Sequence, residues 1–554
     1  MQNPSESESE DIHRARLEEV ERDDDKRWSF HPTYTEFKLL LYVGVGNFLD
    51  AYDLLIINPV STMLQYRLYG NDPIPGGIQG VLKASANIGN VIGQFLFGYM
   101  GDALGRKALY GKELMLIIFG TIMCLTTPTG WSNIRQLSPQ NALIYLTIFR
   151  IIVGIGVGAD YPVSACVISD RAVIKRRGAI LAYVVANQGW GSLVGALATI
   201  VVLGCYKHVM DDKGETSKVD GAWRIVMGLS LIPAFGTLYW RLTLPESTRY
   251  IRSQHQSSSL DSAGAHDSDA PGSPAEGKLE ADAEKDAGKD DTDGTAVHVA
   301  EVTRKTYFRE AREYFSEWRH LKILIGTSMC WFLLDVAFYG INLNQNFVLQ
   351  QIGFGGTTGT TWNKLFKITT GNIIVTALGF LPGYYATVLT IETLGRKWIQ
   401  IQGFLLAGLF LAILASKFHT LSHASFIVCF ALLQFFFNFG ANMTIYIIPA
   451  EVFPTKYRAF GHGFSAAAGK AGALISALVF NQLSFSIGTD KVLWSASSLP
   501  PPCIPIAQLI VLRAVFFGCC MLGVFFSLLI PEVRGRDPDA ILAQEIAEAA
   551  NSKR

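Results

Sequence analysis

Long apolar runs recur along this 554-residue chain, and their lengths match the thickness of a lipid bilayer. A transmembrane helix needs about 20 consecutive apolar residues, because the hydrocarbon core of a bilayer is about 30 Å thick. Only 17% of the residues are charged, whereas soluble domains carry about 25%. These features predict an all-α membrane protein with much of its surface facing lipid.

The apolar runs and the charged residues between them indicate twelve transmembrane helices. The predicted spans are 37–63, 79–101, 109–127, 142–166, 179–203, 223–244, 321–350, 372–393, 399–416, 424–448, 461–483 and 506–530. Residues 253–302 contain almost no large apolar side chain, which is typical of a disordered linker, either plain or regulated through its serines. We therefore expect the following organisation: a tail at 1–36, a six-helix bundle at 37–245, a linker at 246–320, a second six-helix bundle at 321–531 and a tail at 532–554.

Two short motifs occur at equivalent places in the two halves. Asp102-Ala-Leu-Gly-Arg-Lys107 follows the second span, and Glu392-Thr-Leu-Gly-Arg-Lys397 follows the eighth. Pro-Glu pairs also end the sixth and the twelfth spans. Duplicated halves with a substrate site between them are a common plan of transporters.

Basic residues cluster in the short loops on one side of the predicted bundle. They include Arg106, Lys107, Arg176, Arg177, Arg396, Lys397, Lys456 and Arg458. Because basic loops stay in the cytoplasm, we expect this side, the linker and both termini to be cytoplasmic.

Other classes of function find little support in the sequence. The formal net charge is zero, so nothing indicates a nucleic-acid partner. No Cys or His pattern matches a metal site, and no nucleophile–base set or phosphate-cradling glycine loop occurs. We therefore expect no metal, no cofactor and no enzymatic activity, and the sequence does not predict an oligomeric state.

Carboxylates inside the predicted spans need an explanation, since an ionised side chain at the bilayer centre costs about 3 kcal/mol or more. Asp50 and Asp53 lie three residues apart, on one face of the first helix. Neighbouring carboxylates repel, which favours proton binding and suits a proton relay. The alternative is a structural pair that backbone donors or a basic partner such as Arg150 would satisfy. Glu113 would either extend the relay or hold the loop motif at Arg106.

The seventh span carries Trp331, Asp335 and Tyr339 at four-residue intervals, which places them along one stripe of the helix. An acid between two aromatic hydrogen-bond donors is expensive to bury against lipid, so the stripe is expected to face a polar site. Lys470 is the only lysine deep in a late span. It would either attract an anion or neutralise Asp160 or Asp335.

Several runs resemble signatures of known transporters. Gly98–Lys107 and Arg150–Gly158 resemble signatures of the major facilitator superfamily. The run Gly158-Ala-Asp160-Tyr161-Pro162-Val-Ser164 resembles the hallmark of the phosphate:proton symporters of fungi and plants. The resemblance covers about residues 36–250 and 318–536. The second copy of the loop motif departs from the first by starting with Glu392, which puts the symmetry of the gate contacts in doubt.

The resemblance implies a major facilitator fold with two six-helix bundles, and proton-coupled import of inorganic phosphate across the plasma membrane by alternating access. It assigns phosphate contacts to Tyr161, Gln188, Trp331, Asp335, Tyr339 and Asn442, with Lys470 nearby. It makes Asp160 part of the proton path. From the reasoning about buried carboxylates above, we also expect Asp50, Asp53, Glu113 and Asp335 to take part in proton coupling. Gate or motif roles fall to Asp102, Arg106, Arg150, Glu451 and Arg458, through pairs expected to be exposed and individually weak. Three alternatives stay open: symport of a glycerophosphodiester, symport of a sugar, and a phosphate-sensing transporter-receptor.

Overall fold

The computed structural model describes residues 31–70, 72, 74–129, 137–213, 218–244, 247, 249–250, 307–343, 345, 349, 360–416, 421–487 and 506–552. Across these residues the chain is helical with short connections, and no β-strand occurs in them. Eight helical segments of this part are long and apolar enough to cross a membrane. The predicted linker lies mostly outside the described residues, although its last part, 307–316, is helical.

The first half of the chain forms six helical rods in the described residues. They are α2 (Tyr34–Leu68), α3 (Gly76–Ala103), α4 (Lys112–Leu125), α5 (Pro139–Arg171), α6 (Arg177–Cys205), and α7 (Val219–Gly228) followed directly by α8 (Leu231–Leu242). Side-chain caps fix some of these starts: Thr33 and Glu36 form a capping box at α2, and Ser138 caps α5 just before Pro139.

The second half repeats this arrangement with six more rods in the described residues. They are α11 (Trp318–Asn342), α13 (Thr361–Val375) continued by η4 (Thr376–Phe380) and α14 (Leu381–Leu394), α15 (Arg396–Ser416), α16 (His423–Asn438) with α17 (Ala441–Val452), α18 (Arg458–Ile487), and α20 (Ile506–Ser527). A final helix, α21 (Pro538–Ser552), follows. The twelve predicted spans all correspond to one rod each. The eighth rod begins at Thr361 instead of 372. Asn363, Lys364 and Lys367 lower the hydropathy of its first turns, so a hydropathy criterion does not include these turns in the span.

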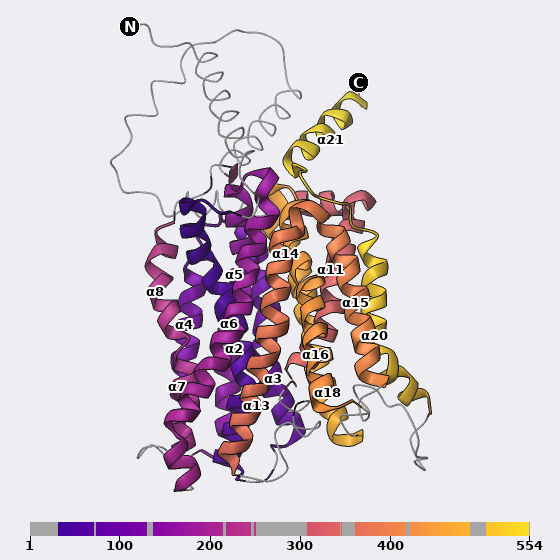
Figure 1. Cartoon of the computed structure of the whole chain (residues 1–554). Coiled ribbons are helices and arrows are strands. Elements are labelled where there is room, and N and C mark those ends of the chain that lie inside the picture. The colour runs from indigo at the N-terminus through magenta and orange to yellow at the C-terminus, as the bar shows by residue number, and fades with distance from the viewer. Residues whose placement is uncertain are drawn as a thin grey trace, which may run out of the picture.

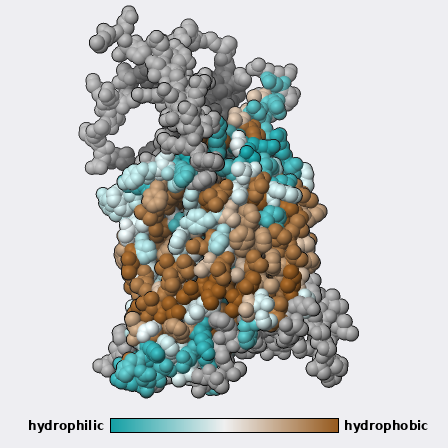
Figure 2. All heavy atoms as spheres, in the orientation of Figure 1, coloured by the Kyte–Doolittle hydropathy of each residue, from teal (hydrophilic) through white to brown (hydrophobic). Residues whose placement is uncertain are grey.

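The two halves stand side by side, with the first half indigo to magenta and the second orange to yellow (Figure 1). On the face seen in Figure 2, a broad hydrophobic band lies between two hydrophilic ends, as expected of a protein that crosses a bilayer. Across the interface α3 packs against α18, and α6 packs against α14. These are spans two with eleven and five with eight, so the duplication of the halves extends to their mutual contacts.

Glycines allow the closest of these approaches. A Cβ on Gly463 of α18 would lie 2.4 Å from the carbonyl oxygen of Gln94 on α3, which is far inside van der Waals contact. Both copies of the loop motif also need glycine for their turn, since Gly105 has a φ of 89° and Gly395 a φ of 85°. The α3–α4 loop, the α14–α15 turn and α21 lie at the same end of the molecule, which we call the loop-motif end (Figure 1).

Candidate functional site

A chain of hydrogen bonds crosses the interface between the halves near the middle of the helices. Asn442 Nδ2 on α17 donates to the Tyr384 hydroxyl on α14 over 2.9 Å, and Tyr384 donates to Gln188 Oε1 on α6 over 3.1 Å. Gln188 Nε2 donates to the Tyr161 hydroxyl on α5 over 2.8 Å, and Tyr161 donates to the Asp50 carboxylate on α2. Five helices, three from the first half and two from the second, therefore meet in one polar network.

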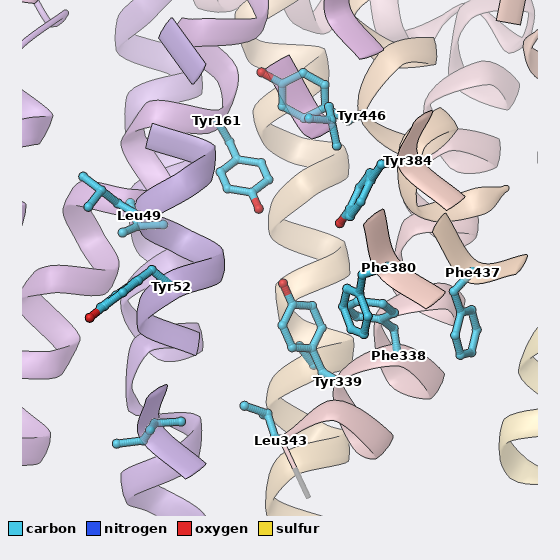
Figure 3. Packing of buried hydrophobic residues seen from close by; sticks show 14 of the residues in the cluster. Leu49, Tyr52, Tyr161, Phe338, Tyr339, Leu343, Phe380, Tyr384, Phe437 and Tyr446 are labelled. Atoms are coloured by element: carbon cyan, nitrogen blue, oxygen red, sulfur yellow. The ribbon is translucent and has the colours of Figure 1, made fainter. Parts of the chain in front are cut away.

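A cation lies next to this network. Lys470 on α18 donates to the Tyr339 hydroxyl and lies 3.6 Å from Asp335 Oδ2 on α11. Its Nζ is also 5.3 Å from the centre of the Tyr161 ring, within cation–π range. Figure 3 shows the hydroxyl groups of Tyr161, Tyr339 and Tyr384 pointing toward a common space between the halves. The arrangement offers several neutral donors and one positive charge to a small anion.

Trp331 completes the stripe on α11 and packs against α18 and α5. A Cβ on Gly469 would lie only 2.1 Å from its indole, so glycine at this position admits the large ring. The ring centres of Trp331 and Tyr161 are 6.3 Å apart. Trp331 thus forms an aromatic wall beside Tyr161.

The space at this site is small. A cavity of about 40 Å³ is lined by Asp50, Gln188, Tyr339 and Tyr384, together with apolar neighbours such as Phe338 and Phe380. A cavity of this kind needs about 10–15 Å³ to hold one water molecule. The site therefore has room for only a few water molecules, and the donors mainly satisfy one another.

The charges at this centre do not balance. Lys470 faces two buried carboxylates, Asp50 and Asp335, with all three side chains at most 2% exposed. Asp335 Oδ2 accepts no hydrogen bond within the described residues. One buried ammonium group therefore faces two buried carboxylates, and burying a charge is costly unless it is paired.

A second charged cluster lies inside the first bundle, and it is organised by an arginine that the sequence reasoning missed. Arg241 Nη1 on α8 lies 3.1 Å from Glu113 Oε1 on α4 and also pairs with Asp160 on α5. The same guanidinium donates to the carbonyl oxygens of Tyr42 and Val43 on α2 at 3.0 Å. Glu113 thus pairs with Arg241, and the alternative that it holds Arg106 is wrong.

The remaining predicted relay residue, Asp53, has a basic neighbour within the first bundle. Asp53 on α2 interacts electrostatically with Arg150 on α5 and with Asp50. Arg150 Nε donates to the Ser85 hydroxyl on α3 over 3.2 Å. The electrostatic interaction of Asp53 with Arg150 agrees with the alternative of a basic partner, while Asp50 itself accepts from Tyr161.

The loop-motif end carries buried ion pairs between the halves. Arg106 lies 3.5 Å from Asp102 and pairs with Asp170 at the end of α5, which also pairs with Arg458 of the second half. Asp102 accepts the backbone N–H groups of Ala459 and Phe460 at 3.2 and 2.9 Å. The expectation that these pairs are exposed is wrong, since their side chains are at most 1% exposed.

The second motif copy makes the corresponding contacts. Glu392 Oε1 accepts the backbone N–H of Ala179 at the start of α6 over 3.0 Å, as Asp102 does at the start of α18. Arg396 pairs with Glu392 and with Glu451 at 2.7 Å each. The replacement of Asp by Glu therefore leaves the gate contact in place.

Sequence reasoning missed four side chains that hold these clusters: Tyr384, Arg241, Asp170 and Arg396. Arg241 carried a usable signal, because an ionisable residue in an apolar run marks a functional cluster. Tyr384 carried no such signal, since a tyrosine in an apolar span is common. Within the described residues no group of His, Cys, Asp and Glu is arranged to hold a metal.

Comparison with known proteins places this geometry in context. The model of the sugar (and other) transporter family matches residues 39–541. The chain belongs to this transporter family. The prediction that it is not an enzyme is confirmed by this membership, because the members are transporters.

Relatives of this transporter include a Schizosaccharomyces pombe protein named as an inorganic phosphate transporter, 40% identical over 97% of this chain and 93% of its own length. The inorganic phosphate transporter PHO84 of Saccharomyces cerevisiae is 34% identical over 92% of this chain and 84% of its own. Among solved structures, the proton:xylose symporter XylE covers 92% of this transporter and 98% of its own chain, with a TM-score of 0.66 and 18% identity. That likeness confirms the predicted major facilitator fold.

Proposed function

We propose that this transporter imports inorganic phosphate together with protons across the plasma membrane by alternating access, with the loop-motif end in the cytoplasm. The observation that carries the proposal is the buried Lys470–Asp335 pair, which adjoins the hydrogen-bond chain running from Asn442 to Asp50. The names of relatives that cover nearly the whole chain support phosphate as the substrate.

Binding requires the donors to exchange partners. In the closed site Tyr161 donates to Asp50, and Lys470 is shared between Tyr339 and Asp335. Phosphate oxygens are strong acceptors, so they compete with both carboxylates for these donors. Protonation of a carboxyl group weakens its hold on the donor and removes its repulsion of the anion. Proton binding and phosphate binding therefore favour each other.

Release follows from the same electrostatics. When Asp335 loses its proton toward the cytoplasm, its charge repels the bound anion. At about 4 Å and an effective dielectric constant of about 20, this repulsion is about 4 kcal/mol, roughly a thousandfold in affinity. The local charge change is large enough to expel phosphate without a signal from elsewhere.

The first bundle supplies the further groups that a proton path needs. Asp50 and Asp53 lie on one face of α2, and Asp160 with Glu113 shares Arg241 closer to the loop-motif end. A proton that leaves the central site can pass to this cluster, because Arg241 balances only one of its two carboxylates at a time. Gly46 of α2 lets Asp160 approach that helix closely.

The buried pairs at the loop-motif end serve as the inner gate. They join the halves through Asp170 with Arg458 and through Glu392 with the start of α6. Rocking of the two halves must break these contacts before the site opens to the cytoplasm, and must re-form them afterwards.

The decisive experiment measures phosphate-driven proton uptake by the purified chain in proteoliposomes. External phosphate should acidify the vesicle lumen, and an imposed inside-negative potential should accelerate uptake if more than one proton moves with each monoanion. Xylose and glycerophosphoinositol serve as the competing substrates in the same assay. Proton flux driven by either competitor but not by phosphate would reject the proposal in favour of a sugar or an organic phosphate.

Lys470 favours phosphate over a neutral sugar. Lys470 is only 1% exposed. A hydrogen bond from a desolvated ammonium group to an anion is much stronger than one to a neutral hydroxyl group. Sugar recognition would not require a buried cation next to a titratable carboxylate.

A further inference from the structure

A larger cavity lies away from the transport site, at the loop-motif end of the second half. Its volume is about 380 Å³, within the range of about 300–1,000 Å³ that is typical of small-molecule sites. It is bounded by the starts of α11 and α15, by the end of α20 with the segment after it, and by α21. Apart from Glu451, none of its lining residues takes part in the proposed transport cycle.

Positive charge gathers on its rim. Lys322 of α11, Lys397 of α15 and Arg536 before α21 all line the cavity. Among the described residues no carboxylate forms an ion pair with any of these three side chains, although Lys397 Nζ donates to the Leu528 carbonyl oxygen over 3.2 Å. Cations that converge on a cavity without carboxylate partners attract an anion.

Both acidic side chains of the lining already have basic partners. Glu451 pairs with Arg396, and Glu545 of α21 lies 3.0 Å from Arg319 and 3.1 Å from His320. They therefore do not cancel the charge of the three rim cations.

The wall between the rim cations is apolar. It includes Val452, Leu528, Ile530, Ile541 and Leu542. Two exposed tryptophans start the flanking helices, Trp318 at 66% and Trp398 at 60% exposure. Tryptophans gather at the level of lipid headgroups. The cavity therefore lies where both a lipid headgroup and a cytoplasmic solute have access.

A neighbouring cavity of about 290 Å³ provides a contrast. It lies between residues 307–316, the end of α3 and the start of α18, and its lining is mainly aromatic, with Arg312 as its one cation among the described lining residues. Convergent positive charge thus distinguishes the larger cavity from this neighbour.

We propose that the cavity between α11, α15 and α21 binds a phosphate-bearing anion, through Lys322, Lys397 and Arg536, at a site separate from the transported phosphate. The apolar wall suits the glycerol and upper acyl carbons of an anionic lipid, while the cations hold its phosphate. A bound anion would hold α21 against the starts of α11 and α15.

The test uses the full-length transporter in phosphatidylcholine nanodiscs, with hydrogen exchange of the 538–552 amides as the readout. One arm titrates dioctanoyl phosphatidic acid, and the other titrates inorganic phosphate. The test variant is Lys322→Gln/Lys397→Gln/Arg536→Gln. The matched control is Lys112→Gln/Arg309→Gln/Arg312→Gln, which removes the same charge from exposed positions that do not line this cavity.

We expect phosphatidic acid to protect α21, with an affinity at least about tenfold lower in the test variant and unchanged in the control, because the test variant loses three charged hydrogen-bond donors. Protection by inorganic phosphate that the test variant loses would also support the site and would identify a free solute as its ligand. If neither probe protects α21, or if both variants respond like the unmodified chain, the proposal is overturned. Equal losses in both variants would also overturn it, because they would indicate non-specific attraction.

Discussion

Lys470 Nζ lies 3.6 Å from the carboxylate of Asp335, and both side chains are almost completely buried at the interface between the two halves. A buried ion pair of this kind stabilises a fold only weakly, because desolvation offsets most of the attraction. An entering anion can replace Asp335 as the partner of Lys470. Anion binding and protonation of the Asp335 carboxyl group therefore become linked.

Asp335→Asn should abolish accumulation of phosphate against its gradient while leaving phosphate–phosphate exchange intact. The amide keeps the size and a donor of the protonated acid but cannot release a proton to expel the anion. Uptake and counterflow in proteoliposomes with an imposed pH gradient separate the two activities, and Asp335→Glu serves as the control that still titrates. Uphill accumulation by the Asn variant would contradict the assigned role.

Lys470→Ala should raise the phosphate dissociation constant by about tenfold or more, since a charged hydrogen bond in a buried site contributes about 1.5–3 kcal/mol. Lys470→Arg should lose less, because it keeps the charge. Equilibrium binding of labelled phosphate to the purified variants measures both. An unchanged affinity in the alanine variant would limit Lys470 to a structural role.

Arg241→Leu should destabilise the transporter by about 3–5 kcal/mol, because it leaves the carboxylates of Glu113 and Asp160 buried without their cation. Thermal unfolding of the purified protein measures the loss. Adding Glu113→Gln and Asp160→Asn to this variant should restore much of the stability but not proton-coupled uptake. Failure of the triple variant to recover stability would show that the arginine acts mainly through its bonds to Tyr42 and Val43.

Asp102→Asn and Glu392→Gln should each loosen the inner gate, but at different helices. Asp102 accepts from the start of α18 and Glu392 from the start of α6. Hydrogen exchange should therefore increase at 458–463 in the first variant and at 177–182 in the second, so that each serves as the control of the other. If both variants increased hydrogen exchange at the same helix start only, the two motif copies would not be equivalent.

The contact of α21 with the gate should persist to low pH. Burial by itself would raise the pKa of Asp539, but Arg458 and two hydrogen bonds from Thr455 hold this pKa below its ordinary value of 3.8. A carboxyl group with a lowered pKa stabilises the folded state above the ordinary value and loses this contribution as the pH falls below it. Hydrogen exchange of 538–552, corrected for intrinsic rates, should show equal protection between about pH 7 and about pH 5. Asp539→Asn should lose protection throughout this range, and a loss in the unmodified chain near pH 5 would contradict the prediction.

The helical fold could be predicted from the sequence because each span is specified locally. A run of apolar residues in lipid must form a helix to satisfy its backbone, so twelve runs predict twelve rods with boundaries uncertain by a few turns. The start of the eighth rod was missed because its first turns carry Asn363, Lys364 and Lys367, which a hydropathy argument treats as loop. The motif glycines Gly105 and Gly395 were likewise local signals, and both occupy the turns that need them.

The pairing of charges could not be predicted, because it depends on which helices face each other. The expected burial of Asp160, Asp335 and Lys470 indicates that each of them needs a partner. From the sequence alone, Lys470 could pair with either acid. Only the packing of α18 against α11, and of α8 beside α4 and α5, assigns Asp335 to Lys470 and Asp160 to Arg241. The sequence determined that charges must be buried in pairs, since an isolated charge in lipid is too costly. The tertiary structure decided the partners, because an ion pair needs two side chains within about 4 Å and helices distant in sequence supply them.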